Sequence, residues 1–260
     1  DVAPVFARSA SLHFIERSEA LREEQRRTLA AYDIDWHKDL STVPDGPVII
    51  IANEFLDALP ISQFVRTAAG WCERMVTHGA NGLEFEVAPL PNATIDETFD
   101  DAPNGSILEQ SEAVEKVVSD IAALCAERPG VALLIDYGHM ITDVGDTLQA
   151  INDHAFHPVL ETPGEADLTA HVDFAAVAQT ARSIGASVHG PVEQGLWLNR
   201  LGAGVRETQL SDGKPEADVA VIRSSIQRLV DPEAMGTLFK VIALGPAGCA
   251  PLSGFSAGTD

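Results

Sequence analysis

Two short runs of consecutive apolar residues dominate the hydrophobic pattern of this chain. The first, VIIIA, begins at Val48 and leads into Asn53 and Glu54, and the second, VALLI, leads into Asp136. Runs of this length between Gly, Pro or Asp residues are typical of strands that are buried on both faces of a sheet. Ligands of open α/β sheets bind at the carboxyl ends of the strands, so the polar residues after each run are placed to meet one.

The rest of the pattern predicts an α/β fold with a mostly parallel sheet. Ser11–Glu16 and Ile34–Trp36 read as short strands on either side of a helix that Ser18 caps, and Val48–Asn53 follows after a loop. This order of strand, helix, strand, connector and strand is typical of a parallel sheet. Further elements are expected at Ser106–Arg128 and Asp173–Gly185 (helices), Ala186–Gly190 and Leu196–Leu201 (extended), Pro215–Val230 (helix) and Leu238–Leu244 (strand).

The middle of the chain has a different character. Between residues 63 and 88, three strand-like segments are separated by Ala-Ala-Gly and Gly-Ala-Asn-Gly, which indicates a hairpin or a meander. Residues 142–169 show little periodicity, and a long irregular segment inside a compact domain is usually functional or disordered. We therefore predict one domain over residues 1–260 with a β-rich insertion at about residues 63–105.

Composition narrows the classes of partner. The formal net charge of −22 argues against nucleic acid or an anionic membrane as a partner. It is compatible with a basic protein partner, but a heavily solvated acidic surface is the simpler explanation. The three cysteines lie far apart, which indicates reduced thiols without a zinc motif, and no apolar run is long enough for a membrane span. Nothing in the sequence defines an oligomeric state. The chain starts at Asp1 and enters its first predicted strand after about ten residues, so we expect the natural protein to begin upstream.

Several blocks of the sequence, taken in order, resemble one protein family. They are LHFIERSEALREEQRRTL, ANEFLDALPISQFV, LLIDYGH, GDTLQAI, PGEADLTAHVDF, GPVEQGLWL and MGTLFKVIAL. This series is similar to the MidA family, S-adenosylmethionine-dependent methyltransferases associated with the assembly of respiratory complex I. The resemblance implies a class I methyltransferase fold, the cofactor S-adenosylmethionine, and N-methylation of arginine on a protein substrate, a complex I subunit. Bacterial members would be cytoplasmic and eukaryotic ones would lie in the mitochondrial matrix.

The sequence departs from the family pattern in one respect. The family has a strand and a glycine-rich loop upstream of the strand that ends at Glu16, and this chain does not contain them. Gly202-Ala203-Gly204 lies far from the expected place and lacks the third glycine of a dinucleotide fingerprint, so we interpret it as a turn. We therefore expect the first strand and helix of the fold to be absent, and residues 1–260 alone to be inactive.

Three residues are candidates for binding the cofactor: Glu16, Trp36 and Asn53. A carboxylate at the end of the second strand of such a fold can accept both ribose hydroxyls; Glu16 could instead be a surface residue beside Arg17, but its position and the resemblance favour the ligand role. Trp36 could stack on the adenine base or belong to the core. Asn53 could instead cap the turn that follows it.

Three carboxylates are candidates for the chemistry: Glu54, Asp57 and Asp136. A guanidinium nucleophile must lose a proton, and carboxylates can hold its planar fork, localise its charge and accept that proton. Glu54 is the first candidate. Asp57 could instead cap a turn, and Asp136 could anchor the loop after its strand.

Other functions are weaker alternatives. The protein could be a non-catalytic assembly protein on a methyltransferase scaffold. A hydrolase that uses Asp136 and His139 would need a nucleophile elbow, which the sequence lacks. Asp167–Asp173 brings acids close to His171, but Asp173 is better explained as a helix cap, and we predict no metal.

Overall fold

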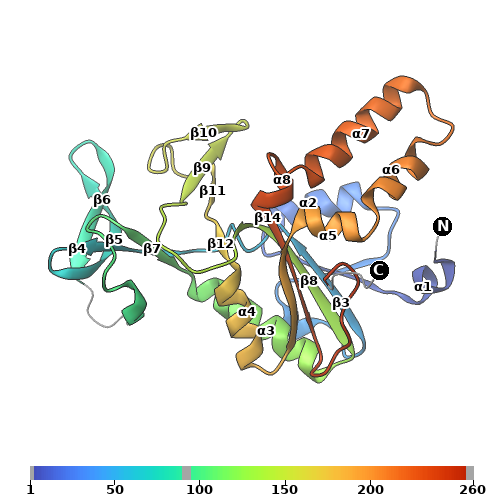
Figure 1. Ribbon diagram of the computed structural model, residues 1–260, viewed down its shortest axis with the longest axis horizontal. Helices are drawn as coiled ribbons and strands as arrows, with labels where there is room; N and C mark the ends of the chain where they lie inside the picture. The colour runs from blue at the N-terminus through green and yellow to red at the C-terminus, as the bar shows by residue number, and fades with distance from the viewer. Residues whose placement is uncertain (1–2, 90–94, 256–260) are drawn as a thin grey trace. The chain divides into compact units, whose positions relative to one another are not determined.

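The computed structural model describes residues 3–89 and 95–255. The chain divides into two compact units, Asp1–Pro47 and Val48–Asp260, and each is described here by itself (Figure 1). The single domain expected for residues 1–260 stays a prediction. Within the described residues, no helix is both long and apolar enough to cross a membrane.

The first unit is built around a parallel pair of strands. Its elements are α1 (Pro4–Ser9), β1 (Leu12–Ile15), α2 (Glu19–Thr28), β2 (Ile34–His37) and the 3-10 helix η1 (Leu40–Thr42). β1 pairs in parallel with β2, and α2 makes the connection between them. The Ser18 side chain accepts a hydrogen bond from the Leu21 N–H and so caps α2. The predicted order of strand, helix and strand is therefore confirmed.

The second unit contains the main sheet. Its strands are β3 (Val48–Asn53), β8 (Gly130–His139), β12 (Val172–Asp173), β13 (Ser187–Glu193) and β14 (Phe239–Gly245). β8 is the central strand, with β3 and β12 paired in parallel to it and β14 antiparallel on its other side. β13 pairs antiparallel with β14. All residues of β14 are buried, so the core of this unit lies at β8 and β14.

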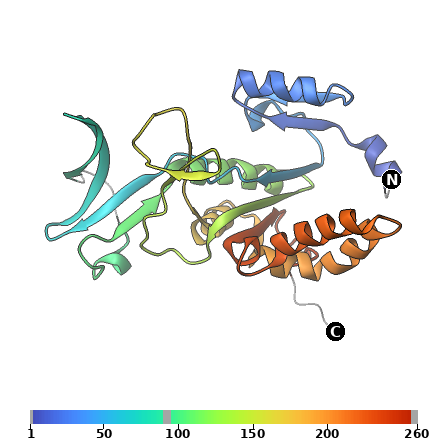
Figure 2. The same ribbon diagram turned by 90° about the horizontal axis from the view of Figure 1, so that it is seen from above.

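Helices pack against this sheet. α3 (Glu112–Glu127), α4 (Phe174–Ser183), α5 (Gln194–Arg200) and α8 (Met235–Leu238) contact its strands, whereas α6 (Ala203–Ser211) and α7 (Glu216–Val230) pack on α5 and on each other. α3 and α4 bury small and branched apolar side chains, and α6 and α7 lie side by side (Figures 1 and 2). The extended structure predicted for Leu196–Leu201 is wrong, because most of that segment belongs to α5. Gly202-Ala203-Gly204 opens α6, with Gly202 as a left-handed N-cap.

β3 differs from the prediction that both of its faces are buried. Ile49 and Ile51 are 65% and 70% exposed, whereas Ile50 and Ala52 on the alternate face are partly covered. Trp197 of α5 helps to line a shallow apolar hollow beside these residues. Among residues 3–89 and 95–255, β3 pairs with β8 alone.

Two smaller antiparallel sheets lie beside the main one. The first has the order β6-β5-β4-β7, from β4 (Ser62–Thr67), β5 (Gly70–Gly79), β6 (Gly82–Pro89) and β7 (Ile107–Gln110), with the 3-10 helix η2 (Glu97–Phe99) before β7. The second has the order β10-β9-β11, from β9 (Gln149–Asn152), β10 (Ala155–His157) and β11 (Asp167–Thr169). The predicted meander is confirmed.

The predicted start of the third helix is wrong. Ser106 and Glu109 have the spacing of a capping box, which predicts a helix from Ser106, but β7 occupies that stretch and α3 begins at Glu112 with Ser111 as its cap. Glu109 instead accepts hydrogen bonds from a distant loop, as described below. Part of the loop expected at residues 89–105 lies outside the described residues.

Candidate functional site

The carboxyl end of β3 presents an exposed carboxylate on an unusual backbone. Glu54 has φ of +47°, in the left-handed region that residues other than glycine rarely adopt. Its N–H donates to the carbonyl of Ile135 (3.0 Å), and the Asn53 amide donates to Glu54 Oε1 (3.2 Å). Such a conformation costs roughly 1–3 kcal/mol and persists only where the surroundings enforce it, often at functional sites.

Asp136 is the residue that enforces this turn. Its Oδ2 accepts the N–H groups of Phe55 (3.1 Å), Leu56 (2.9 Å) and Asp57 (3.2 Å). Its Oδ1 accepts the N–H of Tyr137 at 3.0 Å. The side chain is 1% exposed, and burial, followed by the nearby Asp57 carboxylate, raises its pKa to about 6 against the opposing effect of the N–H groups. This geometry supports the alternative in which Asp136 anchors the loop.

Asp57 and Tyr137 form a second polar pair under the turn. The Tyr137 hydroxyl donates to Asp57 Oδ2, and burial, followed by this bond, raises the pKa of the phenol well above its usual range. Asp57 is only 6% exposed, and its Oδ1 has no partner among the described residues. A buried carboxylate oxygen without a partner can accept a further N–H or O–H donor.

His171 lies next to this pair. Its ring meets the Tyr137 ring edge-on at 5.6 Å, and burial lowers the pKa of the imidazole. The backbone N–H of His171 donates to the Thr147 hydroxyl, and this hydroxyl donates in turn to the Glu109 carboxylate. The described residues contain no group of three or more side chains that could hold a metal ion. Asp173 caps α4 through the Ala175 and Ala176 N–H groups, as predicted.

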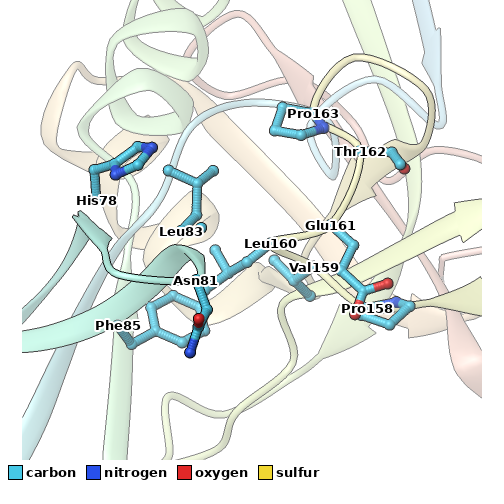
Figure 3. A pocket seen from close by; sticks show the side chains of 11 residues that line it. His78, Asn81, Leu83, Phe85, Pro158, Val159, Leu160, Glu161, Thr162 and Pro163 are labelled. Carbon is cyan, nitrogen blue, oxygen red and sulfur yellow. The ribbon is translucent and has the colours of Figure 1, made fainter.

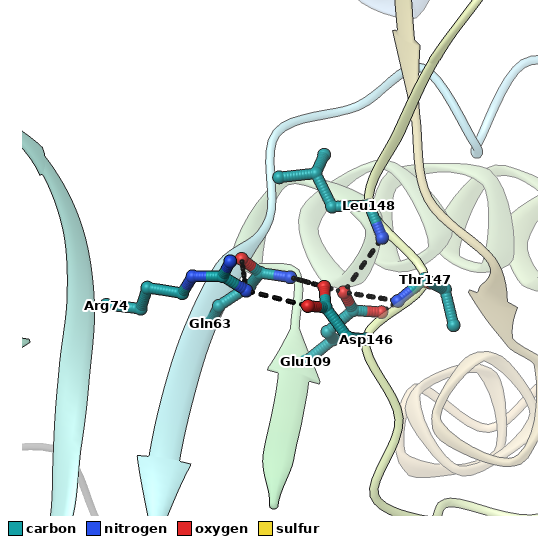
Figure 4. Close-up of polar contacts among 6 residues, drawn as sticks. All are labelled: Gln63, Arg74, Glu109, Asp146, Thr147 and Leu148. Carbon is teal, nitrogen blue, oxygen red and sulfur yellow. Dashed lines mark hydrogen bonds and ion pairs between the residues drawn. The ribbon is translucent and has the colours of Figure 1, made fainter. Parts of the chain in front are cut away.

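A polar network that the sequence did not predict joins the loop before β9 to the β4–β7 sheet (Figure 4). Arg74 donates to Asp146 Oδ2 (2.9 Å), and the Gln63 amide donates to Asp146 Oδ1 (2.9 Å) and Glu109 Oε1 (2.7 Å). Glu109 Oε1 also accepts the N–H groups of Thr147 and Leu148. Its members come from four separate segments, so no local spacing pointed to it. We call these six residues the latch.

In the first unit, Gln25 connects two of the predicted cofactor residues. Glu16 Oε1 accepts the Ser18 N–H (2.8 Å), and Oε2 accepts the Gln25 amide (3.3 Å). The Gln25 oxygen accepts the Trp36 indole N–H at 2.9 Å. Gln25 was not predicted, although its place in the second turn of α2 could have suggested it.

This arrangement fits a nucleoside. Each Glu16 oxygen accepts one hydrogen bond and keeps capacity for another, which is what a ribose diol requires. The partly buried Trp36 ring, flanked by the Arg26 guanidinium at 5.3 Å, is an aromatic surface beside that carboxylate. Asn53, the third predicted cofactor residue, lies in the second unit.

Comparisons with known proteins agree with these features. Residues 1–192 match the family described as "Putative S-adenosyl-L-methionine-dependent methyltransferase". The chain is 33% identical over 278 residues to "Protein arginine methyltransferase NDUFAF7 homolog, mitochondrial" of Drosophila melanogaster, covering 98% of this chain and 63% of that protein. It is 34% identical over 269 residues to the NDUFAF7 protein of Mus musculus, covering 91% of this chain and 59% of that protein. It thus spans less than two thirds of the length of these relatives.

Solved structures show the same fold. A crystal structure of a Burkholderia thailandensis protein bound to S-adenosyl-homocysteine has a TM-score of 0.84 at 26% identity, over 99% of this chain and 70% of that one. A second structure from that organism has a TM-score of 0.82 at 27% identity, over 95% and 69%. The fold is the α/β fold of class I methyltransferases.

Proposed function

The chain belongs to this family of S-adenosyl-L-methionine-dependent methyltransferases, and from that premise we propose that the protein methylates arginine side chains of another protein. When bound, S-adenosylmethionine supplies a methyl group on a positively charged sulfur. The residues of the chain then have to bind the cofactor, orient the guanidinium, exclude water and accept a proton.

We assign cofactor binding to Glu16, Trp36 and Asn53. Glu16 accepts the ribose hydroxyls, and its orientation is fixed by the Ser18 N–H and by Gln25. Trp36 flanks the base. Asn53, at the end of β3, is the third residue that we assign to the cofactor.

We assign the binding of the substrate guanidinium to Glu54 and Asp57. Glu54 is exposed and accepts the fork of the guanidinium, and Asp57 Oδ1, which has no partner in the described part of the chain, is a second acceptor. Asp136 is a positioning residue, because its oxygens accept the N–H groups of the turn that carries Glu54. The observation that carries this proposal is the left-handed backbone of Glu54, which this anchored turn maintains at the end of β3.

The protein substrate is proposed to be a subunit of respiratory complex I, as the family resemblance implies. The fly and mouse relatives are named mitochondrial, and the relatives of known structure are bacterial. We accordingly place the protein in the cytoplasm of a bacterium, or in the mitochondrial matrix if its source is a eukaryote.

The test uses the full-length protein that contains this chain. It is incubated with S-adenosylmethionine labelled in the methyl group and with an extract of cells that lack the protein. Proteins are then hydrolysed to amino acids. Label in methylarginine is the expected result. Binding of S-adenosyl-homocysteine without label in any amino acid would instead favour a non-catalytic assembly protein.

A further inference from the structure

An open groove separates the β5–β6 hairpin from the segment after β10 (Figure 3). Its volume is about 750 Å³, and its lining combines the end of the hairpin with residues 158–163. The apolar side chains in it include Leu83 and Phe85 from the hairpin and Val159 and Leu160 from the opposite wall. Cavities of this size bind ligands, but small-molecule sites usually add several convergent polar groups, which are few here.

Both walls of the groove are fixed. Arg74 lies on the same face of β5 as Val76 and His78, and its guanidinium lies 3.7 Å from the centre of the Phe85 ring. Through the latch, Arg74 bonds to Asp146, in the loop that leads into β9 (Figure 4). The hairpin is therefore tied to the chain that forms the second wall.

The second wall is held by its own contacts. His157 bonds through Nδ1 to the Pro158 carbonyl (2.9 Å) and through Nε2 to the Thr162 hydroxyl (3.3 Å). Thr162 has φ of +42°, and Pro158 and Pro163 stand at the two ends of the segment. The groove is accordingly formed before any partner binds, which lowers the entropic cost of binding.

Charge around the groove is mostly negative, because the Arg74 guanidinium that lies on the Phe85 ring is paired with Asp146. Residues 76–89 and 149–169 contain no lysine or arginine. The acidic residues in these two segments are Glu84, Glu86, Asp153, Glu161, Glu165 and Asp167, and Glu161 is part of the lining. Along the hairpin, Val76 and Phe85 form a cross-strand pair on the groove face, while Glu84 and Glu86 project from the other face. An occupant should therefore be apolar where it lies in the groove and cationic where it leaves it.

We propose that this groove binds an extended basic segment of the protein substrate. Alternate side chains of an extended peptide point in opposite directions, so apolar residues can pack against Leu83 and Leu160 while lysines or arginines point toward the acidic surroundings. The proposal rests on the proposed function, because it takes the groove's partner to be the protein that is methylated. The groove would then select the substrate by the sequence around its arginine.

The test measures peptide binding without cofactor. A fluorescent twelve-residue peptide of alternating arginine and leucine is titrated with the full-length protein as wild type, Leu83→Glu and Met75→Glu. Leu83 lies in the groove, whereas Met75 is exposed on the opposite face of the hairpin, so both variants add one negative charge and only one adds it to the groove. We expect Leu83→Glu to weaken binding at least about tenfold and Met75→Glu to change it less than about twofold.

Several outcomes would overturn the proposal. They are equal binding by the two variants, no binding by the wild type, and equal binding of a peptide with glutamate in place of arginine. Sedimentation that shows a dimer dissociated by Leu83→Glu would make the groove a self-association surface instead. Methyl transfer by the wild type, measured beside peptide binding, separates the two proposals: a protein that binds the peptide but transfers no methyl group would refute the proposed function and leave the groove as a peptide site.

Discussion

Replacing Tyr137 with phenylalanine should destabilise the protein by about 2 kcal/mol. The substitution keeps the ring, including its edge-on contacts with His171 and Phe239, and removes only the hydroxyl. That hydroxyl is the donor to Asp57 Oδ2, and Asp57 is 6% exposed with no partner for its other oxygen among the described residues. A hydrogen bond to a charged acceptor contributes about 1.5–3 kcal/mol, and the carboxylate left behind is buried.

Urea titration and thermal melting measure this change directly. A loss of about 2 kcal/mol lowers the melting temperature by about 4–8 °C in a chain of this size. Tyr32→Phe is the matched control, because it removes the hydroxyl of the other tyrosine, whose side chain is 63% exposed. The reasoning is refuted if Tyr137→Phe and Tyr32→Phe are equally stable, or if Tyr137→Phe costs as much in an Asp57→Asn background as it does in the wild type.

Three further predictions follow from the geometry. Glu16→Ala should weaken S-adenosyl-homocysteine binding by about 2–4 kcal/mol, or about 30- to 1,000-fold by calorimetry, while Asp33→Ala, an exposed carboxylate in the same unit, should leave it unchanged. The raised pKa of Asp136 adds stability that is complete below pH 3.8 and is lost as the pH rises through about 6. In urea titrations, the free energy of unfolding of the wild type should therefore fall by about 3 kcal/mol relative to that of Asp136→Asn between about pH 4 and pH 7. A rise over this range would show that the effect of the N–H groups on the pKa outweighs that of burial. Gly138→Ala should lower the free energy of unfolding by more than about 3 kcal/mol, because a Cβ there would lie 2.0 Å from the Val172 carbonyl oxygen and would push β12 away from β8. A melting temperature like that of wild type would contradict this.

Periodicity and caps were enough to predict most of the architecture. Three local features are confirmed: the strand that begins at Val48, the Ser18 cap and the Asp173 cap. Each of them depends on residues within a few positions. The α5 helix was missed because a seven-residue helix carries too little periodicity to be distinguished from an extended run. The helix start predicted from Ser106 and Glu109 was wrong because the pairing of β7 with β4 outweighed a local capping signal.

The candidate site was predicted only in part. The closeness of Glu54 and Asp136 follows from the strand pattern, and β3 and β8 do pair in parallel, although β8 continues past Asp136 to His139. The left-handed backbone of Glu54 and the anchoring by Asp136 depend on contacts between residues about 80 positions apart. The latch depends on similar contacts, so no local pattern could reveal it.

The measurement that tests the central claim most directly is methyl transfer by Glu54→Gln. The amide keeps the shape of the side chain and loses the charge that orients a guanidinium. In the full-length protein, the rate of methylarginine formation should fall at least about 100-fold, while S-adenosyl-homocysteine affinity stays within about twofold of wild type. Glu233→Gln, an exposed glutamate before α8, is the control and should transfer methyl groups normally. Transfer at the wild-type rate by a folded Glu54→Gln protein would contradict the account and leave Glu54 without a role in the reaction.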